Sequence, residues 1–204
     1  FADGCVRRPG RYGIVFGLHP KDEKAIHRFM QQLGLKNSIQ HRVTKDGHPL
    51  SILYFDNKQI YADLIKHGCV PAKTLTLLPP KKLPKSKIYP FILGLFDGDG
   101  SIYKHDNHGY LNYYFELAGT KAMMAWCKTK LNLYTRVSKH GKNKEGYRVC
   151  CSSLAEIVRI HDLLYTNSDT FRLKRKEDFF KEAKAVYERK LLNNNRVKTK
   201  KTKN

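Results

Sequence analysis

The sequence predicts an α+β fold made of two similar lobes in a single chain of 204 residues. Three observations lead to this prediction. Short segments recur at a nearly constant spacing, both copies contain strand and helix patterns in the same order, and a proline- and lysine-rich stretch separates the copies. We therefore expect two pseudo-symmetric repeats joined by a linker.

The internal repeat is visible in two pairs of segments. Asp3-Gly4 corresponds to Asp99-Gly100 at an offset of 96 residues, and segment 33–39 corresponds to 131–137 at an offset of 98 residues. Each match is weak alone, but two matches at nearly one offset favour duplication over chance.

Hydrophobic periodicity and turn residues give each copy the order strand, strand, helix, strand, strand, helix. The first copy has an extended stretch at 6–18, a helix at 22–33, a turn between two strands at 45–47, and a helix at 58–67. The second copy repeats this order with 102–117, 121–131, 140–146 and 154–164, and a last helix is expected at 174–192. We place the first repeat at 1–78, the linker at 79–90, the second repeat at 91–192, and a basic tail, expected to be irregular, at 193–204.

The charge of the chain indicates a polyanionic partner. Lys and Arg number 39 against 18 Asp and Glu, a net charge of +21 that attracts phosphate backbones. Nucleic acid is favoured over an anionic membrane surface, and no apolar run approaches the roughly 18 residues that a membrane span requires. The five cysteines include no CxxC pair, so neither a disulfide framework nor a zinc site is indicated. We expect buried or half-buried cysteines and an intracellular location, in cytoplasm, nucleoid or an organelle.

Polar and apolar side chains alternate along the predicted strands. Within 112–117, the apolar face carries Tyr113, Phe115 and Leu117, and the opposite face carries Asn112, Tyr114 and Glu116. In the other strands the same alternation selects Gln40, Arg42, Thr44, Arg136, Ser138 and His140 for an outer face. One face of each sheet is therefore expected to be buried. The other is either simply solvated or suited to reading base edges in a major groove.

One segment carries a recognisable motif. Residues 93–100, Leu93-Gly94-Leu95-Phe96-Asp97-Gly98-Asp99-Gly100, resemble the signature of the LAGLIDADG homing endonucleases, and Phe1-Ala2-Asp3-Gly4 is similar to the end of the same motif. We therefore expect the chain to begin inside a helix. The resemblance implies two αββαββα repeats in one monomeric chain, with curved antiparallel sheets forming a DNA-binding saddle.

The resemblance also implies the composition of the active site. In this family the last acidic residue of each motif binds metal, which here means Asp3 and Asp99, with Mg²⁺ or Mn²⁺ as cofactor. The earlier acid, Asp97, is expected to support the site. The resemblance also implies basic catalytic residues at the edge of the site, here Lys73 and Lys176, which are expected to assist hydrolysis near the leaving group or the hydrolytic water.

Small residues in the motif have a structural purpose in this interpretation. Two helices can cross with closely spaced backbones only where the side chains are small. Ala2, Gly94 and Gly98 are therefore the expected contacts between the two motif helices.

The implied function is site-specific hydrolysis of both strands of a long, asymmetric double-stranded DNA site, leaving 3′ overhangs. The expected DNA contacts are arginines and polar strand residues: Arg7, Arg8, Arg11, Gln40, Arg42, Asn112, Tyr114, Arg136, Ser138, His140 and Arg148. Two alternatives stay open on the same fold. One is an RNA maturase that binds intron RNA, and the other is a DNA-binding regulator that does not cleave.

Two other motif interpretations are weaker. Asp97 could begin an EF-hand calcium loop, but the sixth position is Ile102 where Gly is required, and the twelfth is His108 where Glu is required. The segment 105–108 has some likeness to an HNH nuclease motif, but no second motif accompanies it.

Overall fold

The computed structural model describes residues 4–7, 12–108, 110–140, 146–166 and 171–201. The first lobe contains β1 (Gly4–Val6), β2 (Gly13–Leu18), α1 (Glu23–Leu33), β3 (Ile39–Val43), β4 (Pro49–Asp56) and α2 (Lys58–Lys66). The second lobe contains α3 (Ile88–Asp99), β5 (Gly100–Asn107), β6 (Tyr110–Gly119), α4 (Lys121–Leu131), β7 (Ser138–Lys139), β8 (Tyr147–Cys151), α5 (Leu154–Tyr165) and α6 (Lys174–Lys201). Short 3₁₀ turns are η1 (Pro20–Asp22), η2 (Lys73–Leu75) and η3 (Lys85–Lys87).

Both lobes have the same sheet topology. The strand orders are β1-β2-β4-β3 and β5-β6-β8-β7, and all neighbouring strands are antiparallel. Two further positions repeat: Gly34 caps the C-terminus of α1 and Asn132 caps that of α4, and both residues adopt the left-handed conformation, with φ of 64° and 49°. These residues are 98 positions apart, which is the offset predicted from the sequence. The prediction of two pseudo-symmetric α+β repeats is therefore confirmed.

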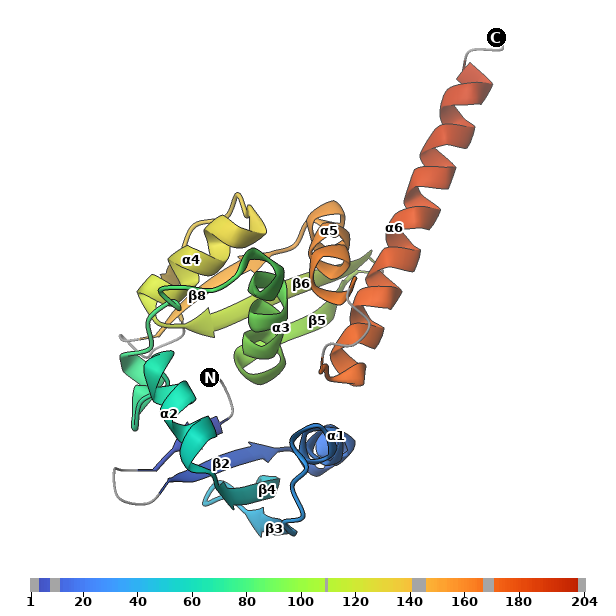
Figure 1. The fold of residues 1–204 in the computed structure, drawn as a ribbon. Coiled ribbons are helices and arrows are strands. Elements are labelled where there is room, and N and C mark those ends of the chain that lie inside the picture. Colours follow the sequence, from blue (N-terminus) through green and yellow to red (C-terminus); the bar gives the residue numbers. More distant parts are fainter. Residues whose placement is uncertain (1–3, 8–11, 109, 141–145, 167–170, 202–204) are drawn as a thin grey trace.

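Each lobe has its own apolar core, and the two lobes face each other across α3 (Figure 1). In the second lobe, helices α3 to α6 bury the apolar face of the sheet, where Phe96, Phe115 and Phe180 are fully buried. In the first lobe, Leu53 and Phe55 of the sheet pack with Ile26 of α1. Full burial of one such side chain contributes about 1.5–3 kcal/mol.

Two boundaries differ from the predicted ones. The motif helix α3 begins at Ile88, three residues before the start that we predicted for the second repeat, because Pro90 lies in the first turn, where its missing N–H has no helical partner to lose. Helix α6 continues to Lys201, so the prediction of an irregular tail is wrong for 193–201. This stretch contains no glycine or proline to end a helix, and Figure 1 shows the far part of α6 projecting from the body of the protein.

The predicted alternation is confirmed in β6 and fails in β3. Tyr113, Phe115 and Leu117 are completely buried, as expected. In β3, only Ile39 is half-buried, and Val43 is 68% exposed. The reason is position, since β3 lies at the edge of its sheet and pairs only with β4.

The cysteines follow the prediction with one exception. Cys69, Cys127 and Cys151 are buried and Cys150 is half-buried, but Cys5 is exposed. Of the helices in the described ranges, none combines the length and the apolar character that a membrane span needs.

Candidate active site and recognition faces

The motif helix α3 ends at Asp99, and the chain turns at once into β5 at Gly100. The amide of Gly100 donates to the carbonyl of Phe96. A Cβ atom on Gly100 would lie 2.3 Å from Cδ2 of Phe96 and 2.6 Å from its carbonyl oxygen, so no other residue fits without movement. This tight turn leaves Asp99 exposed at the helix end.

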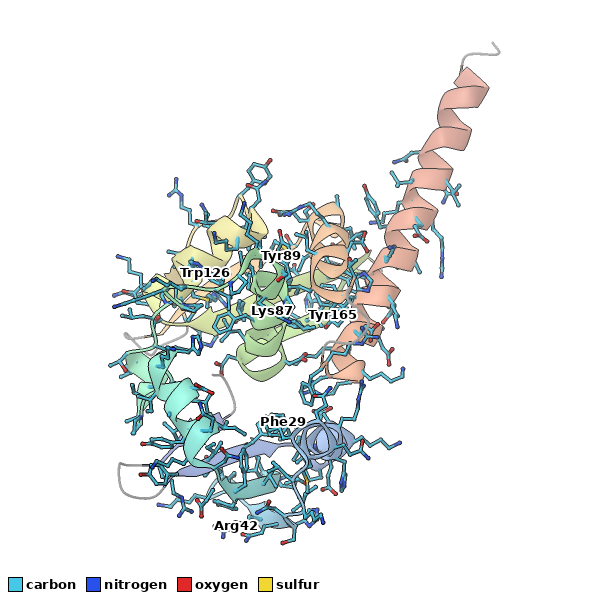
Figure 2. The ribbon with its side chains drawn as sticks, viewed as in Figure 1. Phe29, Arg42, Lys87, Tyr89, Trp126 and Tyr165 are labelled. Atoms are coloured by element: carbon cyan, nitrogen blue, oxygen red, sulfur yellow. The ribbon has the colours of Figure 1, made fainter. Side chains whose placement is uncertain are left out.

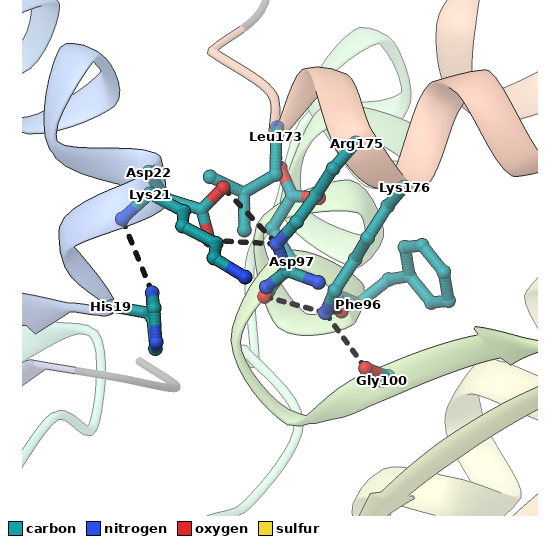
Figure 3. Close-up of polar contacts among 9 residues, drawn as sticks. All are labelled: His19, Lys21, Asp22, Phe96, Asp97, Gly100, Leu173, Arg175 and Lys176. Atoms are coloured by element: carbon teal, nitrogen blue, oxygen red, sulfur yellow. Dashed lines mark hydrogen bonds and ion pairs between the residues drawn. The ribbon is translucent and has the colours of Figure 1, made fainter. Parts of the chain in front are cut away.

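Lys176 holds the end of α3 through hydrogen bonds to its backbone. Its side chain is 5% exposed, and its Nζ donates to the carbonyls of Phe96, Asp97 and Gly100, each at 2.7 Å (Figure 3). An ammonium group has three N–H donors, which is also the number of these backbone acceptors. A cation at this position also interacts favourably with the negative end of the helix dipole.

Lys73 has the corresponding position in the first lobe. It is 8% exposed, and its Nζ donates to the carbonyl of Gly4 at 2.5 Å. Gly4 is the counterpart of Gly100 in the repeat, so each predicted lysine contacts the backbone at the end of its motif. Ala72 just before Lys73 is in the left-handed region, with φ of 56°, a conformation that a residue with a side chain adopts at some cost.

The two lysines come from different lobes, and both act on Asp99. Partial desolvation by the surrounding protein raises the pKa of the Asp99 carboxyl, and the positive charges of Lys73 and Lys176 act in the opposite direction. Within the described residues, the Asp99 carboxylate forms no hydrogen bond and no ion pair of its own. The site therefore brings together one available carboxylate and two anchored cations.

Asp97 supports the site instead of facing solvent. It is 5% exposed, and its Oδ2 accepts the amide N–H of Leu173, just before α6. Burial raises the pKa of Asp97 to about 7, and the hydrogen bond from Leu173 and the charges of Lys176 and Arg175 oppose that increase. Since Asp97 and Asp99 lie in a helix that runs directly into a strand, the arrangement is not an EF-hand loop.

Residues at the start of α6 and just before it contact the first lobe. Leu173 belongs to the second half of the chain but packs in the core of the first lobe, where it is 2% exposed. Arg175 Nε lies 3.1 Å and 2.7 Å from the two carboxylate oxygens of Asp22, which is in η1 of the first lobe (Figure 3). Neither Arg175 nor Asp22 was among the predicted site residues.

Some of the remaining predicted residues lie in the described part of the chain and some do not. Asp3 and Ala2 lie outside the described residues, as do Arg8 and Arg11. Gly94 and Gly98 line a cavity of about 440 Å³ between α3 and the first lobe. A Cβ atom on Gly94 would contact nothing within 4 Å in the described part of the chain, so the predicted close helix crossing stays a prediction.

The first sheet presents a polar recognition face. Arg7 and Arg42 both lie over the ring of Tyr54, each with its guanidinium carbon 5.4 Å from the ring centre, and Arg42 donates to Gln40 at 2.9 Å. Together with Asn37 these residues line a cavity of about 330 Å³. Figure 2 shows Arg42 on the side of the first lobe away from α3, and Phe29 on the side towards it.

The second sheet has a corresponding recognition face on the side opposite its core. The strand register places these side chains on it: Ser101, Tyr103, Asn112, Tyr114, Glu116, Ser138 and Arg148. Tyr103 and Tyr114 stack with ring centres 5.3 Å apart. Arg136 is exposed before β7, and His140 follows β7. The structure thus places the predicted contacts of this lobe on or beside one face.

Comparison with known proteins gives matches only at the level of structure. No protein-family model matches the sequence, and no curated protein sequence matches it. The chain is similar to the LAGLIDADG homing endonuclease I-LtrWI bound to target DNA, with a TM-score of 0.61 at 11% identity over 92% of this chain and 86% of that chain. The meganuclease I-SmaMI bound to uncleaveable DNA gives a TM-score of 0.61 at 11% identity over 93% and 87% of the two chains. I-GzeII in complex with its DNA target gives a TM-score of 0.59 at 12% identity over 97% and 91%.

Proposed function

We propose that this chain, which has the LAGLIDADG homing endonuclease fold, is a metal-dependent endonuclease that cuts both strands of a long DNA site. The observation that supports this proposal most strongly is the surroundings of the Asp99 carboxylate. Its exposed carboxylate ends the motif helix, and the charges of two buried lysines, one from each lobe, act on it. The structural neighbours are named as homing endonucleases bound to DNA, which supports duplex DNA as the substrate.

Binding to DNA follows from charge and from the chemistry of the two recognition faces. A net charge of +21 attracts the phosphate backbone of DNA. The faces carry Arg, Gln, Asn, Ser and His side chains, which suit base edges in the major groove better than lysines alone would. Because the two faces carry different residues, the site they recognise is asymmetric, and one chain supplies both lobes.

The donor chemistry at Asp99 fits a hard divalent cation. Mg²⁺ is usually held by one or two carboxylates together with phosphate oxygens, and the Asp99 oxygens have no partner within the described residues. Asp99 would hold Mg²⁺ or Mn²⁺ together with Asp3, which lies outside the described residues. When bound, the ion would supply a more acidic water and stabilise charge on the phosphate oxygens.

The lysines have a positioning role in this proposal. The ammonium group of Lys176 donates to three backbone carbonyls, and this geometry favours holding the last turn of α3 over contact with a hydrolytic water. Lys73 holds the backbone at Gly4 in the same way. Lys176 keeps the end of α3, and with it Asp99, in place, and both lysines add positive potential where a phosphate would lie.

The test is cleavage of a randomised linear duplex library with the chain and Mg²⁺, followed by sequencing of the cut ends. We expect a single extended consensus, cuts in both strands with 3′ overhangs, and no cutting in EDTA. Parallel binding to duplex DNA and to structured intron RNA is measured in the same buffer.

Three results would contradict the proposal. Cutting that persists in EDTA would exclude metal-dependent hydrolysis. Tight, sequence-specific duplex binding without any cutting would indicate a regulator. Preference for intron RNA over duplex DNA would indicate a maturase.

A further inference from the structure

One carboxylate, that of Glu116, lies on the second recognition face among side chains that are uncharged or basic. Glu116 of β6 accepts a hydrogen bond from Nη1 of Arg148 at 2.8 Å, and its other oxygen lies 3.2 Å from Nδ1 of His140. The Glu116 side chain is only 12% exposed, whereas Arg148 and His140 are 39% and 46% exposed. The acid is thus covered, and the two partners stay open to solvent.

The sheet register explains how the three residues meet. Glu116 pairs with Cys150 of β8, and Arg148 pairs with Ala118 of β6, so the carboxylate and the guanidinium are diagonal neighbours on one face. The amide of His140 donates to the carbonyl of Gly146 at 2.9 Å, which closes the β7–β8 hairpin beside them. The three side chains of the cluster therefore project from backbone that is held by inter-strand hydrogen bonds.

Attraction of DNA alone does not account for Glu116. An acidic residue on a face that meets a polyanion weakens backbone binding, so a different contribution must offset that loss. The guanidinium of Arg148 is held through Nη1, and its Nε is buried without a hydrogen-bond partner in the described residues. The bond through Nη1 restrains the orientation of the guanidinium, and Nη2 has no hydrogen-bond partner among the described residues.

We propose that Glu116 is a positioning residue for base recognition, which orients Arg148 and His140 towards acceptor atoms of a guanine edge in the major groove. This inference rests on the proposed function. An arginine contact to guanine is the commonest specific contact to DNA, and its discrimination depends on where the planar fork points. A purely structural ion pair would hold β6 to the β7–β8 hairpin but would leave base preference unchanged.

The experiment selects duplexes from a randomised library with the wild-type chain, Glu116→Gln and Glu182→Gln, and then sequences the bound pools. Glu182→Gln is the matched control. It removes one carboxylate whose partner, Lys104 at 2.7 Å, projects from the same sheet on the opposite side, towards α6. Thermal melting of each variant is recorded alongside.

We expect Glu116→Gln to lose preference at one or two adjacent base pairs, on the order of tenfold. The rest of the consensus should be retained, and the affinity for random duplex should stay the same or rise, because one negative charge is removed from the face. Glu182→Gln should give the wild-type consensus. If Glu116→Gln does not fold, Arg148→Lys is the second variant. It keeps the charge without the planar fork and should lose preference at one or two adjacent positions.

Two results would overturn the inference. One is a wild-type consensus from the folded Glu116→Gln chain, or from Arg148→Lys. The other is an equal loss at every position together with a lower melting temperature. A wild-type chain that enriches no duplex at all would instead contradict the proposed function, and the inference would fail with it.

Discussion

At the end of α3, Gly100 leaves no space for a side chain, and this makes the active-site turn sensitive to a single methyl group. In Gly100→Ala the new Cβ would meet backbone and ring atoms of Phe96 at 2.3–2.9 Å. We expect a loss of about 1–3 kcal/mol in the free energy of unfolding, measured by urea denaturation, because well-packed sites cannot absorb this overlap.

Gly94→Ala is the matched control in the same helix. A Cβ there meets nothing within 4 Å among the described residues, so the usual helix preference of alanine should stabilise by about 0.5–1 kcal/mol. Equal effects of the two substitutions would contradict the geometry described at the helix end.

Glu23 gives a second prediction at the residue scale, on the pH dependence of stability. Its carboxylate accepts from the hydroxyl of Ser51 at 2.5 Å and lies 2.6 Å from Nε2 of His41, and these contacts lower the pKa of Glu23 below its ordinary value of 4.5. A depressed carboxyl pKa stabilises the fold above the unfolded pKa, and that contribution is lost as the pH falls through the folded pKa.

The measurement compares the wild-type chain with Glu23→Gln by urea unfolding between pH 7 and pH 3. The stability difference should be constant down to about pH 5 and should shrink below about pH 4.5. A difference that grows on acidification would show that these contacts do not favour the charged form.

At the scale of elements, the first turn of α6 is joined to the first lobe by the ion pair between Arg175 and Asp22. The Asp22 side chain is 7% exposed and that of Arg175 is 52% exposed, so the pair is only half shielded from solvent. A double-mutant cycle with Arg175→Met and Asp22→Asn should give a coupling energy of about 1 kcal/mol in urea unfolding. Strict additivity of the two single effects would show that the contact contributes nothing.

Elements with a local pattern were predictable from the sequence, and contacts between distant elements were not. The start of α2 at Lys58 and both bounds of α4, Lys121 and Leu131, match the prediction because side-chain periodicity and capping residues are local. The pairing of Asp22 with Arg175 joins residues 153 positions apart and leaves no local trace.

The candidate site likewise has features that could be predicted from the sequence and features that could not. Family resemblance selected Asp99, Lys73 and Lys176, and the structure brings these three together. The acceptors of Lys176 are backbone carbonyls, which carry no residue signature, so its positioning role could not be predicted. Glu116 was visible in the alternation of β6, but its partners depend on strand register.

At the scale of the whole molecule, the charge predicts strongly salt-dependent binding. A chain with a net charge of +21 and two polar faces should make about six or more phosphate contacts, which corresponds to a slope of log K against log salt near −5. Fluorescence anisotropy with a selected duplex at several salt concentrations measures this slope. A slope between 0 and about −2 would indicate that the excess charge does not contact DNA.

The central claim is that both lobes serve one carboxylate-centred site at the end of the motif helix. The most direct measurement is Mg²⁺-dependent cleavage of a selected duplex by the wild-type chain and by Asp99→Asn, with DNA affinity measured for both. We expect cleavage to fall at least about a hundredfold while affinity changes little, because the substitution removes an anionic metal ligand and leaves the recognition faces intact. Cleavage by Asp99→Asn at the wild-type rate would contradict the account.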